Sequence, residues 1–188
     1  MIERIRKALA GYAPQRLPGQ GLVRAAVLVP VYESAGVLHL VFIKRTEDVE
    51  HHKGQISFPG GTADATDRDL LATALRESQE EIGLDPADVR VLGQLDDHIT
   101  VTNFLVSPFV GLVRRWPYPF VPSQREVAAI LEVPLAYLLD SANLRWERRH
   151  RNGQEILLPA YQWGEEVIWG ATAHILRGFL ALLSDKES

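Results

Sequence analysis

The sequence predicts an α/β fold in which helices are layered on a sheet of mixed strands. Three observations support this prediction: β-rich runs occur throughout the chain, two long segments have helical spacing, and no repeat or low-complexity linker separates them. The length of 188 residues and the mass of 21.0 kDa fit one domain, because domains usually contain roughly 100–200 residues. We therefore expect residues 1–188 to form a single domain with a sizeable core.

The first third of the chain is expected to begin with a helix and continue as strands. Residues 1–15 interleave charged and apolar side chains as a short amphipathic helix does, and we interpret this helix as an extension of the domain. Two β-rich runs, 25–32 and 37–44, flank a short turn and predict a hairpin. A region rich in glycine, histidine and proline, 51–65, is expected to be a loop that contains a short strand at 55–58.

The rest of the chain continues the same alternation. Residues 67–83 have helical spacing and end at Gly83, a residue type that commonly ends helices in the left-handed conformation. The Asn152-Gly153 dipeptide is typical of a hairpin turn. The remaining expected elements are strands at 89–97, 104–114 and 127–133, a proline-bearing loop at 116–124, a short helix at 134–140, a hairpin of 144–149 and 154–161, a short strand at 167–169 and a C-terminal helix, also an extension, at 171–183.

Composition and charge exclude several classes of protein. Twenty Lys and Arg against 24 Asp and Glu give a net charge of −4, and the pI is near 5.9. A protein that coats nucleic acid or anionic membrane is normally basic, so we expect neither partner. With no cysteine, the chain has no disulfide, thiolate zinc site or cysteine nucleophile, so a metal would be held by oxygen or imidazole.

Targeting signals are not evident in the sequence. Residues 1–15 lack the apolar run of a signal peptide. The longest apolar stretch, 25–31, is far shorter than a membrane span. We therefore expect a cytoplasmic protein with no membrane contact.

The helix expected at 67–83 carries a cluster of carboxylates. Glu77, Glu80 and Glu81 fall on one stripe of this helix, apart from the apolar stripe that would pack on a sheet. Clustered carboxylates repel one another, and a divalent cation such as Mg²⁺ or Mn²⁺ bound among them would relieve that repulsion. The alternative is a solvated helix face, which is what most Glu-rich helices present. The spacing alone leaves both interpretations open.

A glycine-containing turn precedes this helix and strengthens the metal interpretation. In Phe58-Pro59-Gly60-Gly61, the glycines let the main chain approach a ligand closely and leave its carbonyls or amides free to contact metal or phosphate. Arg76 lies four residues before Glu80 and can pair with it across one helical turn. An ordinary turn would explain the glycines alone, but the joint pattern favours a binding site.

These residues resemble the signature of the Nudix hydrolases, which is Gly, five residues, Glu, seven residues, then Arg-Glu-aliphatic-x-Glu-Glu-x-Gly-aliphatic. The second half is matched by Arg76, Glu77, Glu80, Glu81, Gly83 and Leu84. Ser78 departs from the aliphatic position, and fourteen residues separate Gly61 from Arg76, one more than the signature has. Asp67 lies six residues after Gly61, whereas counting back from Arg76 reaches Arg68, so the first acid is left open. The resemblance implies an α/β/α sandwich with a mixed β-sheet.

A second set of residues resembles the coenzyme A pyrophosphatases within this superfamily. Residues 41–46, followed by Gly54 and the Phe-Pro-Gly-Gly turn, follow the pattern that precedes the signature in those enzymes, with Glu50 replacing its second arginine. The Trp-Gly-Ala-Thr-Ala run at 169–173 is also similar. The resemblance implies hydrolysis of coenzyme A, or of an acyl or oxidised form, to 3′,5′-ADP and 4′-phosphopantetheine.

The resemblance also implies roles for individual residues. The metal would be bound by Glu77, Glu80 and Glu81, with a main-chain carbonyl of Gly60 or Gly61 completing its coordination. Family members take the general base from a signature glutamate or from a later loop, so the catalytic set contains Glu80, Glu77, Arg76 and, as the later acid, Glu126.

Substrate contacts and alternatives complete the sequence-based hypothesis. The cations Arg45, Lys44 and Lys53 lie near Gly60 and Gly61 and would bind phosphate. Alternatives are hydrolysis of ADP-ribose or a dinucleoside polyphosphate, and a Nudix module that binds a nucleotide without cleaving it. A homodimer is also considered, because one set of apolar side chains could form either core or interface: Leu176, Phe179, Leu180 and Leu183.

Overall fold

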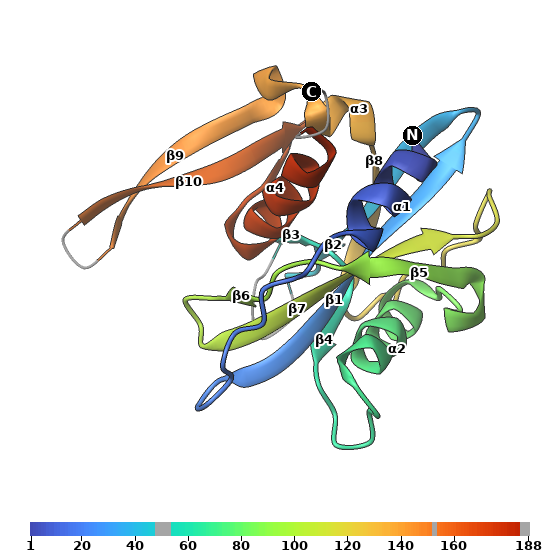
Figure 1. The fold of residues 1–188 in the computed structure, drawn as a ribbon, viewed down its shortest axis with the longest axis horizontal. Helices are drawn as coiled ribbons and strands as arrows, with labels where there is room; N and C mark the ends of the chain where they lie inside the picture. The colour runs from blue at the N-terminus through green and yellow to red at the C-terminus, as the bar shows by residue number, and fades with distance from the viewer. Residues whose placement is uncertain (48–53, 152–153, 185–188) are drawn as a thin grey trace.

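The computed structural model describes residues 1–47, 54–151 and 154–184, and its centre is a mixed β-sheet (Figure 1). Strands β3, β2, β1, β7 and β5 are neighbours in that order, while β4 pairs with β1, β6 with β7 and β8 with β2. Among the described residues these strands are β1 (Val23–Ser34), β2 (Val37–Arg45), β3 (Ile56–Ser57), β4 (Gly60–Thr62), β5 (Val89–Gln94), β6 (His98–Ile99), β7 (Phe104–Val113) and β8 (Val127–Pro134).

Strand β1 is the central element of the sheet. It runs parallel to β7, with Val23 opposite Phe104 and Val31 opposite Leu112, and antiparallel to β2 and β4. A run of apolar residues such as that of β1 suits a strand covered on both faces. The combination of parallel and antiparallel pairs confirms the predicted mixed sheet.

Helices cover both faces of this sheet. Helix α2 (Leu70–Ile82) packs on one face and encloses a core with β1, β2 and β7. Helices α1 (Ile2–Ala10) and α4 (Gly170–Ser184) lie on the opposite side and enclose the second core, as Figure 1 shows. The α/β/α sandwich is therefore confirmed.

Local signals determine where α2 begins and ends. The Asp69 carboxylate caps the helix by accepting a hydrogen bond from the Ala72 N–H. At the other end Gly83 has φ 68°, and its N–H donates to Gln79 O. The helix begins later than the expected residue 67, because the preceding residues form a turn before the cap.

A smaller sheet follows the main one. It consists of β9 (Leu144–Arg151), β10 (Gln154–Trp163) and β11 (Glu166–Ile168), and β9 and β10 project from the body as a hairpin (Figure 1). The connecting helices are α3 (Leu135–Leu139) and the short 3₁₀ turns η1 (Pro86–Asp88) and η2 (Ser141–Asn143). No helix in the described ranges is long and apolar enough to cross a membrane.

Besides the start of α2, the expected elements differ from the structure at helix α1, at strand β5, which ends at Gln94 instead of residue 97, and at two short strands. Helix α1 ends at Ala10 instead of residue 15, because the following segment is tied to the β5–β6 connection: the N–H groups of Gln15 and Leu17 donate to the carboxylates of Asp96 and Asp97. Strands β4 and β6 were not expected, since each is too short to show alternation.

Candidate active site

The Gly60-Gly61 segment, expected to be a turn, is part of strand β4, whose main chain lies against helix α2. At Gly60, where φ is 153°, a Cβ atom would lie 2.3 Å from Ala26 O, so only glycine fits between β4 and β1. A Cβ atom at Gly61 would lie 2.5 Å from the Glu77 carboxylate. The two glycines therefore allow β4 to pair with β1 and at the same time to lie against the carboxylate-bearing face of α2.

Glu81 is the most deeply buried of the predicted site carboxylates. Its side chain is 1% exposed, and it accepts hydrogen bonds from the Gly60 N–H at 2.8 Å and from Arg45 Nη1 at 3.1 Å. Burial raises the pKa of Glu81 to about 7, despite these two hydrogen bonds, and the negative charges of Glu77 and Glu126 act in the same direction. A cation bound nearby would stabilise the charged form of such a buried carboxylate.

Glu77 and Glu80 share one arginine. Arg76 Nη1 donates to Glu77 Oε1 at 2.7 Å and to Glu80 Oε2 at 3.3 Å. Burial raises the pKa of Glu77, and the guanidinium only partly offsets that effect. The Glu80 side chain is 59% exposed, so it lies at the solvent edge of the group.

The side chain that holds Arg76 in place is Asp67. Its carboxylate accepts hydrogen bonds from Arg76 Nε at 3.0 Å and Nη2 at 2.9 Å, and from the hydroxyl of Thr73 at 2.8 Å. These donors, with the guanidinium first among them, hold the pKa of Asp67 well below its usual range. Of the two candidates for the first acid position, Asp67 thus pairs with Arg76, while Arg68 pairs with Asp69.

The other predicted residues divide into three groups. The backbone carbonyl of Glu126 accepts a hydrogen bond from the Thr46 N–H at 2.9 Å, and the Glu126 charge reaches both Glu77 and Glu81. Lys44 lies outside the group, because its Nζ pairs with Glu166 of β11 at 2.6 Å. Lys53, together with His51, His52 and Glu50, lies outside the described residues.

The carboxylates fit a divalent cation by donor type, although they do not converge as a preformed cage. Mg²⁺ and Mn²⁺ prefer carboxylate and carbonyl oxygens, which this region offers around Gly60 and Gly61. In the described part of the chain no three Asp, Glu or His side chains form a ready-made cation cluster. The arginines explain this, because Arg76 engages Glu77 and Glu80 while Arg45 engages Glu81. The assignment of the metal ligands stays a prediction.

Sequence reasoning left two contributors to this site unassigned. Thr73 was not singled out, and its role becomes visible only when its hydroxyl meets Asp67. Asp67 itself was signalled by its position six residues after Gly61, but the inserted residue obscured its partner. The two carboxylate oxygens of Asp67 accept a bidentate pair of hydrogen bonds from the Arg76 guanidinium, and the sequence spacing alone could not predict this geometry.

Comparison with known proteins gives a consistent set of matches. A model of the NUDIX domain matches residues 22–151. The chain is 39% identical over 175 residues to a protein of Pectobacterium atrosepticum described as an uncharacterized Nudix hydrolase NudL, covering 87% of this chain and 84% of that protein.

Solved structures are similar at lower identity. A binary complex of the C. elegans Ap4A hydrolase gives a TM-score of 0.57 at 17% identity, covering 87% of this chain and 98% of that one. The NUDIX domain of Shewanella oneidensis NrtR, complexed with ADP ribose, gives 0.51 at 19% identity, covering 71% and 84%. At this level of identity the two structures support the fold alone.

Proposed function

The chain belongs to the Nudix family of hydrolases, and on that premise we propose that it is a coenzyme A diphosphatase dependent on Mg²⁺ or Mn²⁺. Its products would be 3′,5′-ADP and 4′-phosphopantetheine, or the acyl or oxidised counterpart of the latter. The observation that carries the proposal is the buried Glu81 carboxylate, which is held by Gly60 and Arg45 beside Glu77.

Hydrolysis requires a water molecule to attack a phosphorus atom of a diphosphate that carries several negative charges. A divalent cation supplies charge neutralisation and lowers the pKa of the attacking water when bound. Glu77 and Glu81 are the first candidates to bind it, with Glu80 as the exposed third ligand. The Gly60 N–H and Arg45 fix the orientation of Glu81, and Arg76 does the same for Glu77.

The general base is assigned to one of two carboxylates. Glu126 is exposed at the start of β8 and its charge reaches Glu77 and Glu81, which suits a group that takes a proton from water at the edge of the site. Glu80 is the signature glutamate that is most open to solvent. A comparison of Glu126→Gln with Glu80→Gln in the pH dependence of kcat separates them, because only the base governs the acidic limb.

Phosphate contacts are expected from the nearby cations. Arg45 is the best placed, since its Nη1 lies against Glu81 and its buried Nε has no partner among the described side chains. Lys44 would have to leave Glu166 before it could contact a substrate. Lys53 remains a predicted contact from the sequence alone.

The alternative substrates are ADP-ribose and dinucleoside polyphosphates. These alternatives are considered because Glu50 stands where the coenzyme A pattern has its second arginine. A nucleotide-binding module without catalysis is the third possibility, but a pure binder has less need of all three glutamates of α2. A cytoplasmic location and a homodimer also stay predictions. The four apolar side chains considered for an interface are buried in the core: Leu176, Phe179, Leu180 and Leu183.

The deciding experiment offers several diphosphates to the purified protein. Coenzyme A, acetyl-coenzyme A, ADP-ribose and Ap4A are incubated separately with the protein and Mg²⁺ or Mn²⁺, and the products are separated by chromatography. We expect coenzyme A or its acetyl form to yield 3′,5′-ADP with the highest kcat/KM. Cleavage of ADP-ribose or Ap4A without turnover of either coenzyme A form would contradict the proposed substrate while keeping the reaction class.

A further inference from the structure

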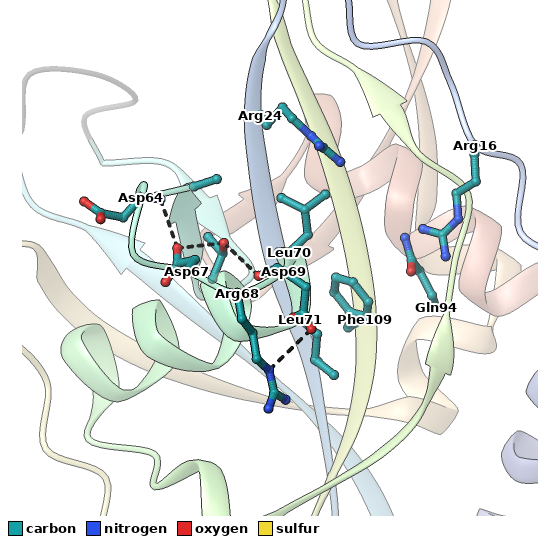
Figure 2. Close-up of a pocket in the computed structure, with 12 residues that line it drawn as sticks. Arg16, Arg24, Asp64, Asp67, Arg68, Asp69, Leu70, Leu71, Gln94 and Phe109 are labelled. Atoms are coloured by element: carbon teal, nitrogen blue, oxygen red, sulfur yellow. Dashed lines mark hydrogen bonds and ion pairs between the residues drawn. The ribbon is translucent and has the colours of Figure 1, made fainter.

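Glu126, the residue just before β8, has an exposed side chain that the described part of the chain does not hold. Its carboxylate makes no hydrogen bond or ion pair with the residues that the structure describes. Asp67 contrasts with it, because in the turn that Figure 2 shows its carboxylate accepts the Asp64 N–H at 2.9 Å, among other donors. The place of the Glu126 charge, which reaches Glu77 and Glu81, therefore depends on how the backbone of Glu126 is anchored.

Thr46 anchors this backbone with two hydrogen bonds. Its N–H donates to the Glu126 carbonyl at 2.9 Å, and its hydroxyl donates to the Arg125 carbonyl at 2.8 Å. These carbonyls belong to the two planar peptide groups on either side of the Glu126 Cα atom. Together the two bonds fix both peptide planes, and with them the direction in which the Glu126 side chain leaves the backbone.

A β-bulge brings Thr46 opposite Glu126. Strands β2 and β8 are antiparallel, and their register shifts by one residue between Lys44 and Arg45. With an unbroken register Thr46 would lie opposite Val127, whereas the shift brings it to Glu126. Bulges are frequent beside active sites, where they change the direction of a side chain.

The loop before Glu126 is also anchored on α2. The Ser123 N–H donates to the main-chain carbonyl of Glu81 at 2.8 Å, and the Glu126 N–H donates to the Ser123 carbonyl at 3.0 Å. On the other side, Thr46 directly follows Arg45, whose guanidinium holds the Glu81 carboxylate. Both anchors thus connect the backbone of Glu126 to Glu81.

We propose that Thr46 is a positioning residue for the hydrolysis and directs the Glu126 carboxylate toward the attacking water. The proposal rests on the proposed function and assigns the base to Glu126 instead of Glu80. The proton passes from the water to the Glu126 carboxylate while the water oxygen attacks phosphorus. An exposed glutamate on a fixed backbone loses less conformational freedom on reaching the reactive geometry, so fixing its peptide planes raises kcat.

The test compares Thr46→Val with Thr46→Ser on whichever diphosphate the unmodified protein cleaves. Valine keeps the N–H and the shape of threonine but loses the hydroxyl bond to Arg125, so we expect kcat to fall about tenfold while KM stays within about twofold. Serine keeps the hydroxyl and should hold kcat within about threefold of the unmodified protein. The matched control, Thr102→Val, removes an exposed hydroxyl that pairs with Thr100 at 3.0 Å and should leave both constants unchanged.

A double-mutant cycle with Glu126→Gln shows whether Thr46 acts through Glu126. In the Glu126→Gln background, Thr46→Val should lower kcat by no more than about twofold, because the positioned side chain can no longer take a proton. A full tenfold loss in that background would overturn the proposal, since Thr46 would then act through another group or through the fold. A rise in KM at unchanged kcat would also overturn it and would point to Arg45.

The same measurements separate this proposal from the proposed function. If the unmodified protein cleaves a diphosphate but Thr46→Val keeps its kcat, only the role of Thr46 is contradicted. If the unmodified protein cleaves none of the diphosphates offered, the proposed function fails and the role of Thr46 fails with it.

Discussion

The two ends of the α2 region hold carboxylates in opposite electrostatic states. Before the helix, Asp67 accepts hydrogen bonds from Arg76, from Thr73 and from the Asp64 N–H, and its pKa lies well below its usual range. In the last turn, Glu81 is almost completely buried and its pKa is raised to about 7. Both face an arginine, so the presence of a cation does not explain the difference.

The difference lies in the balance between burial and donors. Asp67 gains enough hydrogen bonds to offset its desolvation, whereas Glu81 has one N–H group and one guanidinium nitrogen against near-complete burial. A carboxylate whose charge is satisfied by the fold stabilises the fold. A buried carboxylate with too few hydrogen-bond donors can instead bind a cationic ligand. The number of donors relative to burial thus separates a structural acid such as Asp67 from a functional acid such as Glu81.

Glu81→Gln tests the functional end and carries the largest expected effect. Loss of one carboxylate that would bind the cation should lower kcat/KM by about 100-fold or more. Some stability should also be lost, by about 1–3 kcal/mol, because the Gly60 N–H and Arg45 bind different oxygens of Glu81 and glutamine keeps an acceptor for only one of them. Activity is measured on the preferred diphosphate and stability by urea unfolding.

The matched control for this variant is Glu3→Gln. Glu3 is an exposed acid on α1 that pairs with Arg6. It makes the same chemical change far from the site and should leave kcat/KM unaltered. Retention of activity in Glu81→Gln would show that the buried carboxylate does not take part in the reaction.

Asp67→Asn tests the structural end, and its main effect is expected on stability. The Asp67 side chain is 7% exposed, and the change leaves Arg76, which is partly open to solvent, with only Glu77 and Glu80 as carboxylate partners in the described ranges. We expect the free energy of unfolding to fall by about 2–3 kcal/mol, less than a fully buried pair gives, because Arg76 is partly solvated and keeps two other carboxylates. Asp69→Asn is the control, since asparagine caps a helix as well as aspartate does. Equal losses in both variants would refute a special role for Asp67.

Local patterns in the sequence predicted much of this region. The spacing of Glu77, Glu80 and Glu81 and the position of Gly83 identified the helix and one face of it, because helical geometry depends on neighbouring residues only. The layered fold followed from the alternation of strands with two amphipathic helices. These features need no information about which distant segments meet.

Contacts between distant segments could not be predicted in the same way. Lys44 is adjacent in sequence to Arg45, yet it pairs with Glu166, which is 122 residues away. The Gly60-Gly61 dipeptide was interpreted as a turn, whereas its backbone pairs with β1 as strand β4. In both cases the outcome depends on a partner that folding brings close, and no periodicity in the sequence encodes that partner.

The pH dependence of stability gives a smaller effect and compares the two ends directly. In protein freed of metal by a chelator, folded Glu81 holds its proton up to a pKa of about 7, whereas its ordinary value is 4.5. Between these values the folded state binds more protons than the unfolded state, so the free energy of unfolding should fall as pH rises from about 5 to 7, by about 1–2 kcal/mol.

Asp67 acts with the opposite sign and in a different window. Its lowered pKa adds stability above the ordinary value of 3.8, and this stability is lost only as the pH falls below that value. Urea unfolding at pH 5, 6 and 7 should therefore show a decline that Glu81→Gln reduces and Asp67→Asn leaves in place. Because burial also raises the pKa of Glu77, part of the decline should persist in Glu81→Gln. An identical slope in the Glu81→Gln variant and the unmodified protein would mean that the buried carboxylate is charged across this range, and the two ends of α2 would then not differ as the structure indicates.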